Sequence, residues 1–224
     1  MIKVGKNIVL RDLKKNYSSF QNLTLILGFY LSLIVIFPIS LGNSSSILTN
    51  FASSILWVCL LLTSLSFLNN VFEDDLKDGW LDQVIISNFP LEIIVVLKAI
   101  SHWISIILPL IIMTPIILIV LDISLYFLFN IILILIIGSI TLSLLGVMTS
   151  SLVLGSKNTN VLSFLIVLPL CIPVLIFGVS ATNTVINNEN TFSHFYLLCT
   201  TLTLVLIFSP IASAQALKIA SENS

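Results

Sequence analysis

The densest group of ionisable side chains in this sequence lies between residues 72 and 84. It contains one lysine among several carboxylates: Glu73, Asp74, Asp75, Lys77, Asp78 and Asp82. Apolar side chains recur every four residues through it, at Phe72, Leu76, Trp80 and Val84. A helix with this spacing carries an apolar ridge among acids, which a partner protein can bind, and Gly79 either breaks that helix or admits a partner's backbone. The alternative is a solvated loop whose ridge rests on the bilayer surface.

The apolar stretches hold almost no ionisable groups, which limits the chemistry that the chain can perform. Asp122 lies at one boundary, and His102 and His194 lie near the ends of stretches. A proton-coupled carrier or a membrane-embedded hydrolase needs ionisable groups at one depth in the bilayer. The sequence also lacks the G-x-x-x-x-G-K-[ST] loop that binds ATP phosphates. We therefore expect no enzyme activity, no resident metal and a separate subunit for any ATP hydrolysis.

Composition indicates a membrane protein that spans the bilayer several times. Apolar residues make up 58% of the chain, charged residues only 8%, and the mean hydropathy is +1.16, whereas soluble domains are about 25% charged. Its 224 residues leave no room for a second soluble domain beside six spans. We predict an all-α fold in one transmembrane domain, residues 1–224, with spans near Leu23–Leu41, Ile47–Leu68, Ala99–Asp122, Tyr126–Leu154, Val161–Ala181 and Phe195–Leu217.

Basic residues indicate which side of the membrane each connection faces. All nine precede the first span, follow the sixth, or lie between spans 2 and 3 or 4 and 5: Lys3, Lys6, Arg11, Lys14, Lys15, Lys77, Lys98, Lys157 and Lys218. Lys and Arg near span ends are retained on the cytoplasmic side during insertion. Both termini and the polar segment 69–97 are therefore predicted to be cytoplasmic, which agrees with an even number of spans.

Residues 1–20 have the periodicity of an amphipathic helix. Apolar positions recur at Ile2, Val9, Leu13, Tyr17 and Phe20. Lys3, Arg11, Lys14 and Ser18 face away from that stripe. Such a helix lies in the membrane interface, where anionic lipids attract its lysines. The alternative is a basic lead-in that only sets the topology.

Small residues and prolines mark the helices that contact or bend. Spacings of three and four place Ser139, Ser143, Gly146 and Ser150 on one face of the fourth span, a pattern that favours close helix packing in lipid. Pro109, Pro169 and Pro173 lie inside the third and fifth spans, where proline frees a backbone carbonyl and permits a bend. Whether these bends accompany movement or only shape the helices stays open at this point.

The order of these motifs resembles the haem exporter protein B (CcmB) family, and the resemblance covers essentially the whole chain. Glu73-Asp74-Asp75-Leu76-Lys77-Asp78-Gly79, followed by Leu81-Asp82-Gln83, is similar to that family's cytoplasmic loop. Lys98-Ala99, His102-Trp103, Leu108-Pro109-Leu110, Leu168-Pro169-Leu170 and Ser209-Pro210 continue the match. Trp80 departs from the pattern, because related loops often carry a small polar residue there.

The resemblance implies a permease of the ABC-2 exporter type that acts in cytochrome c maturation. Its expected partners are a cytoplasmic ABC ATPase, a second copy of itself, a polytopic haem-handling protein, a small membrane protein, a haem chaperone and membrane lipid, with no nucleic acid. Haem is then a transported or partner-held ligand, ATP is used by the partner, and no cofactor is bound stably. The expected location is a bacterial inner membrane, with a mitochondrial inner membrane as the alternative.

The resemblance also suggests roles for particular residues. Glu73, Asp74, Asp75, Leu76, Asp78, Gly79, Trp80, Leu81 and Asp82 are the predicted ATPase-coupling residues. His102 and Trp103 form a candidate functional pair that either contacts haem or positions the loop, and the second role is favoured because a lone histidine is no metal-ligand pattern. The rival functions are export of another substrate and membrane assembly without a transport path.

The charge asymmetry predicts which positions are accessible from outside the cell. Cysteines introduced at Ser45 or Asn187 should react with a membrane-impermeant thiol reagent applied to intact cells. Ser45 lies between the first and second spans and Asn187 between the fifth and sixth, and neither connection contains a basic residue. Cysteines introduced at Lys77 or Lys157 should react only after the membrane is opened. Reaction of this second pair in intact cells would exclude the six-span topology.

Overall fold

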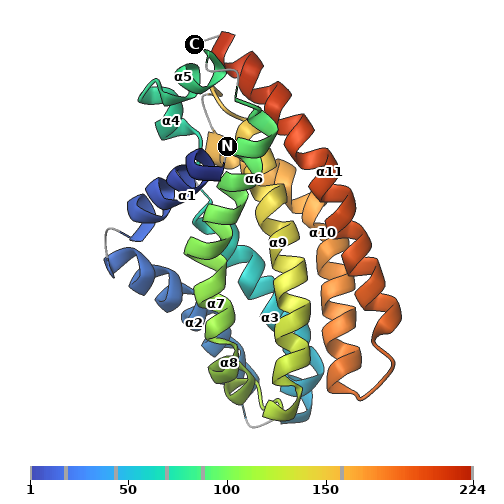
Figure 1. The fold of residues 1–224 in the computed structure, drawn as a ribbon. Helices are drawn as coiled ribbons and strands as arrows, with labels where there is room; N and C mark the ends of the chain where they lie inside the picture. Colours follow the sequence, from blue (N-terminus) through green and yellow to red (C-terminus); the bar gives the residue numbers. More distant parts are fainter. Residues whose placement is uncertain are drawn as a thin grey trace.

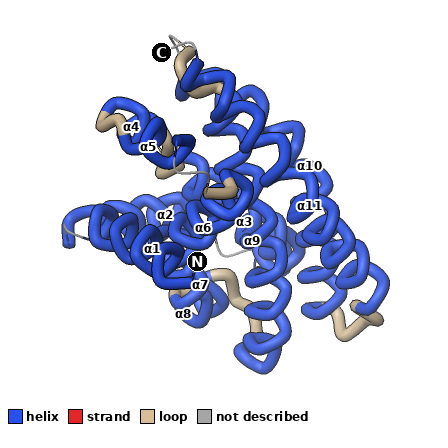
Figure 2. The backbone as a smooth tube through the Cα atoms, turned by 45° about the horizontal axis from the view of Figure 1, so that its top comes forward, coloured by secondary structure: helices blue, strands red, loops and turns tan. Residues whose placement is uncertain are grey.

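Long apolar helices dominate the computed structural model of this chain, because a spanning segment must satisfy its backbone hydrogen bonds internally. The structure describes residues 2–17, 20–42, 45–68, 71–86, 89–156 and 159–222, and within these ranges it contains helices and connections but no strand (Figures 1 and 2). The first half comprises α1 (Ile2–Tyr17), α2 (Phe20–Leu41), α3 (Ser45–Ser66), α4 (Glu73–Lys77), α5 (Trp80–Ile86) and α6 (Leu91–His102). The second half comprises the π-helix η1 (Trp103–Ile107), α7 (Leu108–Ile112), α8 (Thr114–Val120), the 3-10 helix η2 (Leu125–Phe127), α9 (Leu128–Leu152), α10 (Thr159–Ile186) and α11 (Phe192–Glu222).

Six of the described segments are long and apolar enough to cross a membrane, which confirms the predicted all-α polytopic fold. They are Gln21–Leu41, Ile47–Ser66, Leu91–Ile112, Leu125–Leu152, Val161–Ile186 and Phe192–Ser221. The third begins at Leu91, eight residues before the start expected near Ala99. Pro90 precedes its first turn in an extended conformation, and the apolar run after it continues the helix. Lys98 therefore lies inside this helix and is buried, so it does not mark the helix start.

Helix α9 is the centre of the bundle. It packs against α3, α6, α10 and α11, while α2 contacts α3, α7 and α8 at the periphery. In Figure 1, α9 stands between α6 and α7 on one side and α10 and α11 on the other. Its predicted small face is confirmed, because Ser139, Ser143, Gly146 and Ser150 are all buried. A Cβ atom at Gly146 would lie 2.8 Å from the Leu68 side chain, so glycine is what lets the chain after α3 come this close.

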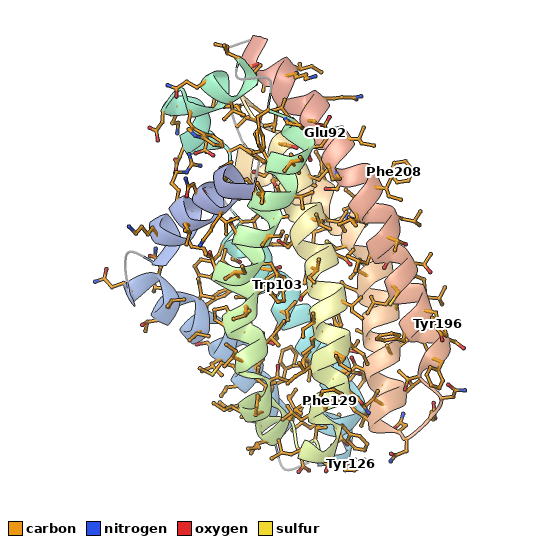
Figure 3. All side chains as sticks on the ribbon, in the orientation of Figure 1. Glu92, Trp103, Tyr126, Phe129, Tyr196 and Phe208 are labelled. Carbon is orange, nitrogen blue, oxygen red and sulfur yellow. The ribbon has the colours of Figure 1, made fainter. Side chains whose placement is uncertain are left out.

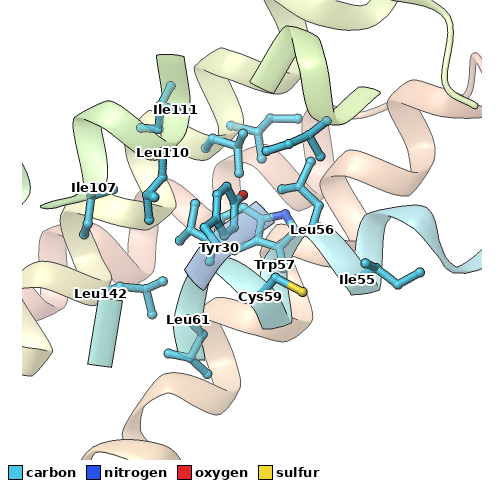
Figure 4. Packing of buried hydrophobic residues seen from close by; sticks show 14 of the residues in the cluster. Tyr30, Ile55, Leu56, Trp57, Cys59, Leu61, Ile107, Leu110, Ile111 and Leu142 are labelled. Carbon is cyan, nitrogen blue, oxygen red and sulfur yellow. The ribbon is translucent and has the colours of Figure 1, made fainter. Parts of the chain in front are cut away.

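Trp57 of α3 fills the space between α9 and α10. Its indole is fully buried, and a Cβ atom at Gly138 or at Gly178 would lie 2.3 Å or 2.6 Å from it. The indole N–H donates a hydrogen bond of 2.9 Å to the Thr182 hydroxyl. Figure 4 shows Trp57 among the buried side chains that include Tyr30, Leu56 and Leu110. Three spans are thus held together by one large ring between two glycines, which is the close packing that membrane helices need.

The chain before Pro109 departs from α-helical geometry. The five residues of η1 are π-helical, and they join α6 to α7. Proline has no N–H to donate to the preceding turn, and π-helical turns occur where the regular hydrogen-bond ladder is interrupted. Pro169 and Pro173 lie within α10, which is assigned as helix from Thr159 to Ile186. Bending at these three prolines stays a prediction.

The contacts of Trp57 predict that its two glycines are intolerant of added volume. Gly138→Ala or Gly178→Ala should destabilise the purified protein by about 1–3 kcal/mol, because the enclosed indole has no room to move. Gly28→Ala in α2 is the matched control, since a Cβ atom there meets nothing within 4 Å. The measurement is thermal unfolding in detergent. Equal melting temperatures for all three variants would show that Trp57 is not held in this way.

Candidate functional site

The acidic segment folds as two short helices and not as one helix that carries the whole apolar ridge. Helix α4 ends at Lys77 and α5 begins at Trp80, with Gly79 between them at φ +69°. Glycine adopts this left-handed conformation without strain, so Gly79 ends the first helix as one of its two interpretations predicted. The turn divides the ridge, because Phe72 and Leu76 precede it whereas Trp80 and Val84 follow it in α5. Phe72 is fully buried in the bundle, and Leu76 is half-buried.

Four charged side chains meet where this segment contacts the rest of the protein. We call Arg11, Asp12, Asp75 and Lys98 the charge cluster. The Arg11 Nη2 atom donates hydrogen bonds to Asp12 Oδ1 at 2.8 Å and to Asp75 Oδ1 at 3.0 Å. The Lys98 ammonium forms ion pairs with Asp12 Oδ2 at 3.0 Å and with Asp75 Oδ2. Each carboxylate therefore contacts both cations, and the cluster has no net formal charge.

The charge cluster connects three segments that are distant in sequence. Arg11 and Asp12 come from α1, Asp75 from α4 and Lys98 from α6, which begins the third span. Asp12, Asp75 and Lys98 are each only 5% exposed. Burying a charge is costly unless it is paired, so removing one member leaves an uncompensated buried charge that costs about 3–5 kcal/mol. The positions of α1 and α4 on α6 are thus strongly linked.

Aromatic rings cover the charge cluster. The Arg11 guanidinium lies 4.0 Å from the centroid of the Trp80 ring, a distance at which a cation is attracted to the ring face. The Lys98 ammonium lies 5.6 Å from the same ring and 5.8 Å from the Phe72 ring. Lys98 also donates a hydrogen bond of 3.3 Å to the Val71 carbonyl. Trp80 therefore contacts both cations of the charge cluster through its ring.

The other predicted coupling residues divide between an inner and an outer surface. Leu81 is fully buried against the same apolar cluster as Phe72, whereas Asp78 is exposed. Lys77 donates a hydrogen bond of 3.0 Å to Glu73 on the surface, and this bond raises the pKa of its ammonium above the usual value. Asp74 is half-buried in the same short helix. The Asp82 side chain lies outside the described residues.

The N-terminal helix forms as predicted, but its contact face differs. Gly5, Ile8 and Asp12 are its buried positions, and α1 packs along α6 with them. Arg11, expected to face away with the lysines, instead reaches Asp75 because the charge cluster provides carboxylates for it. Val9 and Leu13 of the predicted stripe are half-buried, while the side chains of Ile2, Tyr17 and Phe20 lie outside the described residues.

His102 and Trp103 are engaged in helix packing between α6 and α9. The Ser143 hydroxyl donates a hydrogen bond of 2.7 Å to the Ala99 carbonyl, so it accepts the 3.0 Å hydrogen bond from His102 Nδ1. The Trp103 indole N–H donates to the Ser139 hydroxyl at 2.9 Å. Figure 3 shows Trp103 within the bundle, and Nε2 of His102 is enclosed as well. These contacts favour a positioning role over contact with haem.

Sequence reasoning found Asp75 and Trp80 but missed their partners. Asp12 is the only acid among residues 1–20, and Lys98 is the only charge in the apolar run from Ile93 to Ser101. A carboxylate in a basic helix and a lysine in an apolar helix are both costly alone, so their pairing was a detectable signal. Within the described part of the chain, no group of three or more His, Cys, Asp or Glu side chains could hold a metal. What the charge cluster does is electrostatic: its ion pairs hold α1, α4 and α6 together.

Fold and site together define a polytopic membrane protein with a small helical layer at one end, the class to which transporter permeases belong. The sequence model of the CcmB protein family matches residues 4–220. Heme exporter protein B of Bradyrhizobium diazoefficiens is 35% identical over 191 residues, 85% of this chain and 86% of that protein. Heme exporter protein B of Escherichia coli K12 is 36% identical over 193 residues, 86% of this chain and 88% of the relative. The chain belongs to the CcmB protein family.

Neutrality of the charge cluster predicts the behaviour of single and paired substitutions. Lys98→Met should lower the free energy of unfolding by about 3–5 kcal/mol, because two carboxylates then share one cation in a buried site. Adding Asp12→Asn should recover a large part of that loss by restoring neutrality. Lys77→Met is the control, since this lysine is exposed and should change stability by less than about 0.5 kcal/mol.

Thermal unfolding of the wild type and the three variants in the same detergent measures these differences in stability. Additive losses in the double variant, with no recovery, would contradict the paired arrangement of Asp12 and Lys98.

Proposed function

We propose that this chain is the permease subunit of an ABC transporter complex that exports haem for cytochrome c maturation. Family membership supports this assignment, since the relatives named heme exporter protein B match along more than four fifths of the chain. ATP is hydrolysed by a separate cytoplasmic subunit in this proposal, because the chain has no phosphate-binding loop of the G-x-x-x-x-G-K-[ST] type. The bacterial relatives favour a bacterial inner membrane.

The main support for the proposal is that residues 71–86 have an inner surface that contacts the bundle and an outer surface that is free for a partner. Asp75 and Trp80 point inward to the charge cluster, while Leu76 is half-buried and Asp78 is exposed on the outer surface. An ATPase that binds the outer surface can displace α1 and α6, because Asp75 on the inner surface forms ion pairs with both helices. Residues 73–86 therefore act as the coupling element and do not bind the transported ligand.

The remaining partners follow from the family. Two copies of this chain would pair with two ATPase subunits, a polytopic haem-handling protein, a small membrane protein and a membrane-anchored haem chaperone. ATP-driven movement would release the haem-loaded chaperone on the outer side. Haem is a passing ligand in this scheme and is held by the chain only during export.

A second candidate function is mechanical remodelling of that complex without passage of haem through this subunit. The packing of His102 and Trp103 against Ser143 and Ser139 favours it, because these two side chains are committed to the contact between α6 and α9. Haem flux into vesicles that contain the purified complex distinguishes the two functions. ATP-dependent flux supports export, whereas chaperone release without flux supports remodelling.

Substitutions on the two short helices should uncouple the complex without preventing membrane insertion. Leu76→Asp should weaken ATPase binding by about tenfold or more, because a leucine contact is worth about 1.5–3 kcal/mol. Gly79→Leu should disturb the same surface, since a leucine is strained at φ +69°. The measurements are co-purification of the ATPase and the amount of chaperone that stays haem-loaded.

Tyr126→Asp is the control for the added charge. Tyr126 is exposed at the opposite end of the bundle (Figure 3), where a cytoplasmic ATPase cannot reach it. Normal co-purification and normal cytochrome c maturation in both coupling variants would exclude residues 73–86 as the coupling element.

A further inference from the structure

An open groove of about 490 Å³ runs between α1 and the start of α6, two helices that pack side by side (Figure 1). Apart from Lys6, the residues that line it are apolar: Gly5, Val9, Leu10, Phe89, Ile93 and Leu97. Leu10 on one wall is 47% exposed and Ile93 on the other is 40% exposed. The groove therefore presents apolar surface that an occupant from outside the chain can cover.

The groove lies where the hydrocarbon layer begins, on the side of the membrane predicted to be cytoplasmic. The third span, Leu91–Ile112, has 22 residues, which corresponds to about 33 Å at 1.5 Å per residue. A bilayer core is about 30 Å thick, so Ile93 in the first turn lies where headgroups meet acyl chains. Leu97 and Ile100 follow Ile93 at spacings of four and three, and Ile100 is 43% exposed. The apolar wall thus continues from the groove into the bilayer.

Basic side chains accompany the apolar groove. Helix α1 has five basic residues and one acidic residue, a formal net charge of +4, and four of its lysines are outside the charge cluster. Lys6, Leu10 and Lys14 are four residues apart, so they lie along one face of α1, and all three are exposed. Glu92 is exposed in the first turn of α6 but does not line the groove. A ligand that matches these features has an acidic headgroup and a hydrocarbon tail.

We propose that this groove binds one molecule of an anionic phospholipid. The Lys6 ammonium donates hydrogen bonds to the phosphate, and Lys14 on the same face adds to the attraction. One acyl chain covers Ile93 and continues along Leu97 and Ile100 into the bilayer. A soluble anion would leave the apolar walls uncovered, and an apolar helix of another protein would make no use of the Lys6 charge.

The lipid would stabilise the same helix pair that the charge cluster holds. The two helices already touch in the groove, because a Cβ atom at Gly5 would lie 3.4 Å from the Leu97 side chain. Arg11 of α1 reaches Asp75 of α4, so the charge cluster holds α1 from the side of the short helices, whereas the lipid holds it from the bilayer. The site depends only on α1 and the start of the third span. It therefore stands whether or not the chain exports haem.

Charge reversal at Lys6 tests the headgroup contact. The purified chain in detergent receives equal amounts of phosphatidylglycerol and phosphatidylcholine, and native mass spectrometry measures which lipid is retained. The wild type should retain phosphatidylglycerol in preference. Lys6→Glu should lower that retention by about tenfold, because a carboxylate replaces the ammonium beside the phosphate. Lys218→Glu is the matched control at an exposed lysine near the end of α11, and it should stay within about twofold of the wild type.

Equal retention of the two lipids by the wild type, or equal retention of phosphatidylglycerol by the two variants, would overturn the proposal. Both lysines are exposed, so neither reversal should prevent folding, and thermal unfolding without added lipid checks this.

Filling the groove tests the place of the acyl chain. Val9→Trp adds a large apolar side chain to the groove while Lys6 is kept, and Ile211→Trp adds the same group on α11, where Ile211 is 50% exposed. Val9→Trp should lose the preference for phosphatidylglycerol, and Ile211→Trp should keep it. Retention by Val9→Trp at the wild-type level would show that the groove is not the site.

A photo-reactive group identifies the occupant in the complete complex. Leu10 replaced by benzoylphenylalanine should cross-link to phospholipid in the native membrane, because Leu10 lines the groove and is exposed. Cross-links only to another protein subunit, or only to a second copy of this chain, would overturn the proposal.

Discussion

Charge neutrality inside a nearly uncharged protein is the constraint on which the arrangement of this molecule depends. Asp12, Asp75 and Lys98 are buried charges that are costly alone, and the ion pairs that they form with one another and with Arg11 offset this cost. Because they come from three segments, the N-terminal helix and the short helices α4 and α5 cannot leave α6 without exposing a charge imbalance. Buried ion pairs of this kind add little net stability, but they define one arrangement sharply.

The spanning helices are held together by close packing and hydrogen bonds and not by charges. In lipid there is little hydrophobic gain from helix contact, so shape and interhelical hydrogen bonds determine the packing. Trp57 between Gly138 and Gly178, and the serines of α9 that contact His102 and Trp103, meet that requirement. The bundle is therefore closely packed, while the layer formed by α1, α4 and α5 is joined to it both by the charge cluster and by apolar side chains such as Ile8 and Leu81. A partner that moves this layer acts on the bundle through α6.

The periodicity and charge of the sequence predicted the spans and the small face of α9, since both depend on local composition. They did not predict the start of α6 or the contact face of α1, because Lys98 and Arg11 were assigned to solvent by their charge alone. The burial of Lys98 and the inward direction of Arg11 depend on Asp12 and Asp75, and Asp75 is distant in sequence from both cations. The break at Gly79 was one of two interpretations, and only the backbone conformation separates them. The hydrogen bonds of His102 and Trp103 likewise depend on Ser143 and Ser139 of α9, which are distant in sequence.

The central claim is that the charge cluster transmits movement from residues 71–86 to α1 and to α6, which begins the third span. The most direct measurement is the number of haem-loaded chaperones released per ATP hydrolysed by the reconstituted complex that contains Arg11→Gln with Asp75→Asn. This pair of substitutions keeps the cluster neutral, retains Asp12 with Lys98, and removes the direct bond between α1 and α4. The account predicts that the ATPase stays bound and active while release per ATP falls severalfold. An unchanged ratio in a complex of normal stability would contradict it.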